Sequence, residues 1–267
     1  MFVSSAIVAA LLIAAALPVL RGWLPHLALP DHTARTAVQP ALTAAGGPFT
    51  GTVADKYPVG QAGIVLPKAK AIDTFTVAEV DAALKQVRRA LIAGRLEERM
   101  LVRHDTSAFV ALISPAQRPE AKRWAKESRM SGVATWIDPA VKLDPKYPPR
   151  VSGKVTFGVV TYEGRQHLQV TTNFVWVYAF KQGEPPYAAV HDSVVWEFYK
   201  ASEVSAKYRG MQVIDWHSYF FAMDCVASDK NLLSPNRHPR RGFDRDHEDS
   251  DDYLSPDHPL EVRDGCI

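Results

Sequence analysis

The chain has only two cysteines in 267 residues and almost no net charge. Its 31 lysines and arginines nearly balance 29 aspartates and glutamates, so a formal charge of +2 gives no case for a nucleic-acid partner. The motifs G-x-S-x-G, G-x-x-x-x-G-K-[ST], G-x-G-x-x-G and C-x-x-C are absent. Common hydrolase, nucleotide-binding and thiol-redox chemistries therefore lose support. Without H-E-x-x-H or paired cysteines, we expect neither a metal site nor a cofactor.

What the chain does have is an uncharged run over residues 2–20, FVSSAIVAALLIAAALPVL. At about 1.5 Å per residue, a helix of this length nearly crosses a hydrocarbon core of about 30 Å. We therefore expect a membrane anchor. A secretory signal cleaved near Ala14 to Ala16 and a buried helix of a soluble protein are the alternatives. No basic residue precedes the run and Arg21 follows it, which by the positive-inside rule favours a cytoplasmic C-terminal side.

The two cysteines, Cys225 and Cys266, favour the opposite orientation. A disulfide between them would close a loop of about 40 residues and stabilise the fold by about 4 kcal/mol in the chain-entropy model. Two unrelated thiols are the alternative. Because disulfides persist outside the reducing cytoplasm, the bridge predicts a single-pass protein of the cell membrane with its domain outside the cytoplasm, or a domain secreted after signal cleavage.

The rest of the chain divides by composition and periodicity. Thr76 and Glu79 form a capping box for a helix predicted over 77–93, with Gly94 at its C-terminal end. From Arg150 the apolar period becomes two, which predicts four antiparallel strands, the third over 189–200 and the fourth over 212–224. The predicted parts are the apolar segment 1–20, a Pro/Gly-rich linker 21–73, an α+β domain 74–226 and a polar tail 227–267.

One long helix, two short helices and four long antiparallel strands form an order that resembles the nuclear transport factor two-like superfamily. The resemblance covers residues 75–225 and implies a curved sheet wrapped around the first helix as a cone. A cystatin-like sheet with one helix is the competing fold. In catalytic members of the superfamily an Asp, sometimes with a His, works in the cone. The alanine-rich, anchor–linker–domain layout also resembles membrane-anchored or secreted uncharacterised proteins of high-GC Gram-positive bacteria.

Strand alternation selects the candidate site residues. In the last strand, Asp215 and His217 share a face with a mostly apolar row from Met211 to Met223. If they line a cavity, this pair could transfer a proton. A structural hydrogen-bonded pair, or a solvated pair at the sheet edge, is the alternative. The candidate ligand-pocket residues on the last two strands are His191, Asp192, Trp196 and Tyr219, although alternation places His191 and Asp192 on opposite faces.

Together these features predict a non-catalytic, extracytoplasmic binding or assembly module of the cell envelope, tethered to the membrane by its N-terminal helix. Its partner would be an envelope protein or a small apolar ligand. The alternative is a small cone-type enzyme of the isomerase, cyclase or dehydratase kind. It would use Asp215 and His217 on an apolar substrate.

Overall fold

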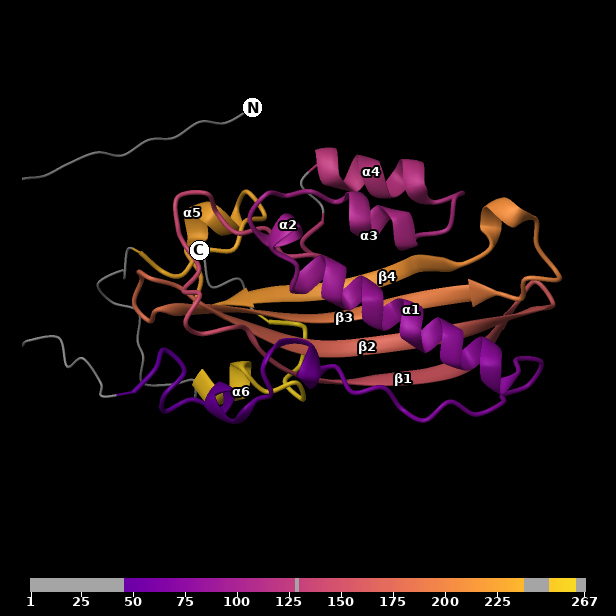
Figure 1. The fold of residues 1–267 in the computed structure, drawn as a ribbon, viewed down its shortest axis with the longest axis horizontal. Coiled ribbons are helices and arrows are strands. Elements are labelled where there is room, and N and C mark those ends of the chain that lie inside the picture. The colour runs from indigo at the N-terminus through magenta and orange to yellow at the C-terminus, as the bar shows by residue number, and fades with distance from the viewer. Residues whose placement is uncertain (1–45, 128–129, 238–249, 263–267) are drawn as a thin grey trace, which may run out of the picture. The chain divides into compact units, whose positions relative to one another are not determined.

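A four-stranded antiparallel sheet forms the centre of the computed structural model, which describes residues 46–127, 130–237 and 250–262 (Figure 1). The strands lie in chain order, which confirms the predicted α+β class and antiparallel meander. The first hairpin turns at Glu163 and Gly164, whose φ angles of 50° and 76° suit a tight two-residue turn. The strands are β1 (Arg150–Tyr162), β2 (Arg165–Ala179), β3 (Tyr187–Tyr199) and β4 (Met211–Phe221).

The long helix α1 (Val77–Arg95) crosses one face of this sheet (Figure 1). Its predicted capping box is present, because the Glu79 amide donates to Thr76 Oγ1 and the Thr76 amide donates to Glu79 Oε2. Gly94 does not end the helix as predicted, but lies in its last turn. A Cβ at Gly94 would lie 2.5 Å from the Val133 carbonyl oxygen, so this glycine permits a close approach of backbone.

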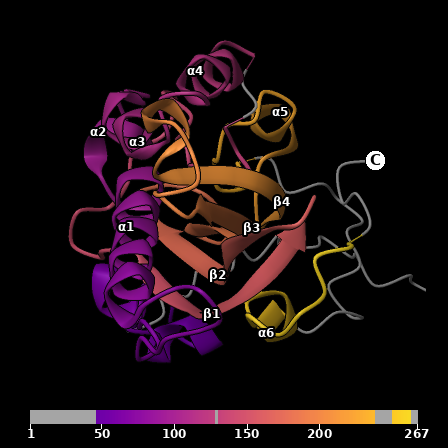
Figure 2. The same ribbon diagram turned by 90° about the vertical axis from the view of Figure 1, so that its right-hand side faces the viewer.

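Shorter helices surround the sheet. Figure 2 shows α3 and α4 beside β4, and α6 on the side of the sheet opposite α1. No helix of the described residues is long and apolar enough to cross a membrane, and the apolar run 2–20 lies outside them. The short elements are α2 (Glu98–Leu101), α3 (Ser107–Leu112), α4 (Arg118–Lys126), α5 (Cys225–Ser228), α6 (Ser250–Tyr253), η1 (Val53–Lys56), η2 (Gly60–Gly63) and η3 (Ala206–Tyr208).

The main core lies between α1 and the sheet face that it covers. Even-numbered residues of β2, among them Val170, Phe174 and Trp176, are fully buried there. They pack with a stripe of α1 that includes Leu84 and Leu91. Residues three or four positions apart on α1 therefore pack against alternate residues of β2. Burial of each large side chain stabilises the folded state by about 1.5–3 kcal/mol.

We name the sheet face away from α1 the outer face, and within the described part of the chain only a portion of its length is covered. A second apolar cluster there includes Phe49, Val175, Val177 and Leu254. Residues assigned by sequence to the linker and the tail thus bury side chains against β2 and β3. The folded unit is therefore larger than the predicted domain 74–226.

A β-bulge in β4 changes which side chains share a face. Val213 pairs with Trp196 and Asp215 pairs with Val195, so Ile214 is an extra residue between them. Val213 consequently faces α1, whereas Asp215 points to the outer face. The predicted single row from Met211 to Met223 is wrong, because the bulge inverts the alternation within it.

Replacement of Gly94 tests the close approach at the end of α1. Gly→Ala in a helix normally stabilises by about 1 kcal/mol. We expect Gly94→Ala instead to destabilise by about 1–3 kcal/mol, since the added methyl meets the Val133 backbone. Urea unfolding measures the change. The control is Gly158→Ala in β1, where nothing lies within 4 Å of the added carbon. Equal effects of the two variants would contradict the prediction.

Candidate functional site

The structure separates the six predicted site residues into three environments. Asp192 and Trp196 are buried on the α1 side of β3. His191 and Tyr219 are buried on the outer face, where they pair across β3 and β4. Asp215 and His217 are exposed farther along that face. The four proposed pocket residues therefore do not line one pocket, because neighbouring residues of a strand point to opposite faces.

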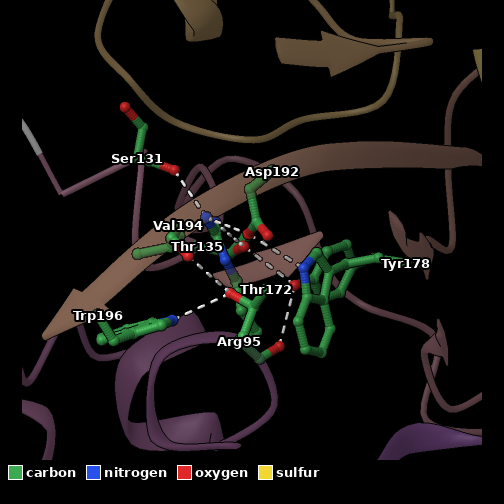
Figure 3. A network of polar contacts seen from close by, with 9 residues as sticks. Arg95, Ser131, Thr135, Thr172, Tyr178, Asp192, Val194 and Trp196 are labelled. Carbon is green, nitrogen blue, oxygen red and sulfur yellow. Dashed lines mark hydrogen bonds and ion pairs between the residues drawn. The ribbon is translucent and has the colours of Figure 1, made fainter. Parts of the chain in front are cut away.

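Asp192 forms a buried ion pair with Arg95, the last residue of α1 (Figure 3). The Arg95 Nη2 to Asp192 Oδ2 distance is 2.6 Å, and the two side chains are 0% and 1% exposed. Arg95 also donates to Thr135 Oγ1 at 3.0 Å and to the Ser131 carbonyl at 3.0 Å. The guanidinium thus joins α1 to β3 and to the 131–135 loop.

Aromatic side chains of β2 complete this network. Trp176 Nε1 donates to Asp192 Oδ2 at 3.1 Å, and the Tyr178 hydroxyl donates to the Arg95 carbonyl at 2.9 Å. Burial raises the pKa of Asp192 to about 6, although Arg95 and these hydrogen bonds act in the opposite direction. Burial likewise raises the pKa of Tyr178. These polar groups are directed at one another within the core.

Trp196 belongs to the same core but not to the ion-pair network. Its Nε1 donates to Thr172 Oγ1 at 3.0 Å, and the Thr172 hydroxyl donates to the Val194 carbonyl at 3.4 Å (Figure 3). The indole is fully buried. The predicted pocket residue Trp196 therefore packs and bonds internally.

His191 lies under the C-terminal segment 250–262 on the outer face. Its Nε2 is 2.8 Å from Asn173 Oδ1 and its Nδ1 is 3.1 Å from the Tyr219 hydroxyl, which donates to the Tyr253 carbonyl. The Tyr253 ring also stacks on His258, with centroids 4.5 Å apart. Burial, aided by repulsion from His258, lowers the pKa of His191 to about 4. His191 is therefore neutral at neutral pH and helps to hold the C-terminal segment.

Asp215 and His217 lie close to each other on the solvent-exposed surface. His217 Nε2 lies 3.4 Å from Asp215 Oδ2, and the side chains are 64% and 60% exposed. Asp215 Oδ1 also accepts from the Trp216 amide. An exposed contact of this kind contributes about 0–1 kcal/mol. The described residues contain no group of three or more potential metal ligands.

Sequence reasoning missed Arg95 and a second buried pair, His167 and Glu197, whose Nδ1 and Oε1 lie 2.8 Å apart. A signal for Arg95 was present, because it follows Leu91 by four residues and so continues the apolar stripe of α1. The predicted helix ended at residue 93, however, so Arg95 lay beyond it. The predicted Cys225–Cys266 bridge stays a prediction, since Cys266 lies outside the described residues.

Comparisons with known proteins give no family for this chain: no protein-family model, curated protein or solved structure matches it. Its geometry is therefore the basis for any functional conclusion.

Removal of Arg95 should be far more costly than removal of an exposed arginine. Arg95→Gln leaves the buried Asp192 carboxylate without its cation, so we expect a loss of about 3–5 kcal/mol. Arg99→Gln is the matched control, because Arg99 pairs with Asp105 at the surface and its loss should be far less destabilising. Chemical denaturation followed by tryptophan fluorescence measures both. A loss at Arg95 no larger than at Arg99 would refute the structural role.

His191 should make stability fall in mild acid. Its folded pKa of about 4 lies below the ordinary histidine value of 6.5. Between these values the unfolded state binds a proton that the folded state does not, so this contribution is lost as pH falls from 6.5 to 4. We therefore expect His191→Gln to gain stability relative to wild type over that range. Denaturation curves at several pH values measure this difference. Ser193→Ala, a non-titrating change on the same face, should change the free energy of unfolding by the same amount at every pH. If His191→Gln also gave a pH-independent change, the lowered pKa of His191 would be contradicted.

Proposed function

We propose that this chain is a non-catalytic binding or assembly module, tethered at the cell membrane with its domain outside the cytoplasm. The observation that carries the proposal is the part of the outer face that the described residues leave uncovered. Two rows of side chains run straight across all four strands there. They are Lys154, Asn173, Ser193 and His217, and Thr156, Thr171, Val195 and Asp215. All eight are exposed or half-buried. We call these eight residues the open rows.

The chemistry of the open rows favours a macromolecular partner. They offer hydroxyl, amide and charged groups spread over four strands. A small apolar ligand needs a largely apolar concavity, whereas a contact between proteins can include a broad polar rim. An envelope protein is therefore the preferred partner, and a small apolar ligand is the less favoured one.

The position of Asp215 and His217 weakens the enzyme alternative. In a cone-type fold the reacting groups would lie in the concavity. Here both side chains lie in the open rows, on the face away from α1, and are more than half exposed. Proton transfer needs groups held around a substrate at hydrogen-bonding distance. An open face offers less of that enclosure.

The finer description of the fold belongs to this proposal. A long capped helix against a four-stranded meander supports a curved sheet of the cone-like or cystatin-like kind. Membership of the nuclear transport factor two-like superfamily rests on element order alone. The membrane tether rests on the apolar run 2–20, and the outside location rests on a bridge between Cys225 and Cys266.

Site-specific photo-crosslinking in intact cells tests the proposal. A photoreactive phenylalanine at Thr171 or Ser193 should give a discrete adduct in the membrane fraction, because both positions lie in the open rows. The same group at Lys122, an exposed residue of α4, is the control and should give none. A membrane-impermeant amine reagent should label the domain in the same cells. Adducts of equal yield at Thr171, Ser193 and Lys122 would contradict the binding role of the open rows. A domain that the amine reagent does not label would contradict the location outside the cytoplasm.

A further inference from the structure

A small hollow lies beside the C-terminal end of α1, outside the open rows. Its volume is about 200 Å³. Leu101 of α2, Leu143 and Ala179 of β2 contribute apolar walls, and Tyr147 with neighbouring prolines forms the rim. The charged lining residues are Glu98 and Asp144, and both are acidic. The hollow thus combines an apolar interior with negative charge.

Hydrogen bonds hold the rim of the hollow in place. The Asp144 amide donates to the Ala179 carbonyl, which fixes this loop to the end of β2. The Lys146 amide donates to Asp144 Oδ1 at 3.0 Å, and the Tyr147 amide donates to the Asp144 carbonyl. Among the described residues, Asp144 Oδ2 has no hydrogen-bond partner. One carboxylate oxygen is therefore held by the loop while the other is available to a ligand.

Two exposed cations lie near the hollow, and one of them, Arg103, contacts a lining carboxylate. Glu98 lies 3.5 Å from Arg103, and both side chains are largely exposed, at 77% and 62%. Lys146 places its Nζ 5.2 Å from the centre of the Tyr147 ring. Exposed contacts of this kind are weak. A better placed cation can replace them.

We propose that this hollow receives one basic side chain of a partner protein. The aliphatic stem packs against the leucine and proline walls, and the cationic group binds between Asp144 and Glu98. The volume is below the roughly 300–1,000 Å³ of drug-sized sites, so it suits a single side chain. A purely apolar side chain would desolvate the carboxylates without compensation. This contact is separate from the open rows and does not depend on them.

Methyl NMR of the full-length chain in detergent micelles tests the proposal. The probes are the leucine methyls of Leu101 and Leu143 and the Ala179 methyl. The titrants are N-acetyl-arginine methylamide and its uncharged isostere N-acetyl-citrulline methylamide. We expect the arginine derivative to shift these methyls, with a dissociation constant of about 1 mM or lower and at least about fivefold tighter binding than the citrulline derivative. Equal binding of the two derivatives would overturn the proposal. So would the absence of any shift of these methyls at an arginine derivative concentration about 50-fold above the expected dissociation constant.

Matched variants locate the binding to the two carboxylates. Asp144→Asn keeps an oxygen for the Lys146 amide and so preserves the loop, and Glu98→Gln alters an exposed side chain. Each should weaken arginine binding by about threefold to tenfold. Glu120→Gln on α4 is the control and should leave it unchanged. If neither Asp144→Asn nor Glu98→Gln weakened arginine binding, the assignment of the binding site to this hollow would be overturned.

Discussion

The buried ion pair between Arg95 and Asp192 links α1 to the centre of the sheet and restricts how the helix can be placed on it. Burial of two charges costs several kcal/mol per ion, and this is offset only where every remaining donor and acceptor finds a partner. The partners come from the 131–135 loop and from β2, through Thr135 and Trp176. Arg95 Nε and Asp192 Oδ1 nevertheless stay buried without a hydrogen-bond partner among the described residues, so the offset is incomplete. The bonds that are made require one placement of α1 on the sheet. A well-packed apolar pair could stabilise the fold as much. We therefore infer that the ion pair contributes mainly by favouring one arrangement of α1 on the sheet.

Strand β3 places a second titratable group directly beside this pair, on the opposite face. His191 loses its stabilising contribution as pH falls towards its folded pKa of about 4. The pKa of Asp192 is raised to about 6 from 3.8, so the folded state binds a proton there that the unfolded state does not. Its contribution therefore grows as pH falls. Across the window from pH 4 to 6 the contributions of these two neighbours to the free energy of unfolding therefore change in opposite directions and partly cancel.

The sequence was sufficient where local rules decide the structure. The capping box of α1, the two-residue period of the strands and the Glu163–Gly164 turn each depend on neighbouring residues, and the structure confirms them. Long-range features were missed. The bulge at Ile214 exists only in the pairing of β4 with β3, and Arg95 is buried only because Asp192 faces it. The packing of residues 46–57 and 250–254 on the outer face likewise depends on partners distant in sequence.

The register of β4 against β3 places the groups with shifted pKa values and the groups that solvent reaches at different positions. Asp192 and His191, a carboxylic acid and an imidazole whose pKa values are shifted by burial, are at most 1% exposed and bonded within the fold. The acid and base that solvent reaches, Asp215 and His217, lie on an open face. A general acid or base needs a tuned pKa and contact with the substrate at one position. Here the bulge in β4 keeps the exposed pair away from the core side of the sheet, which supports a binding role for the outer face.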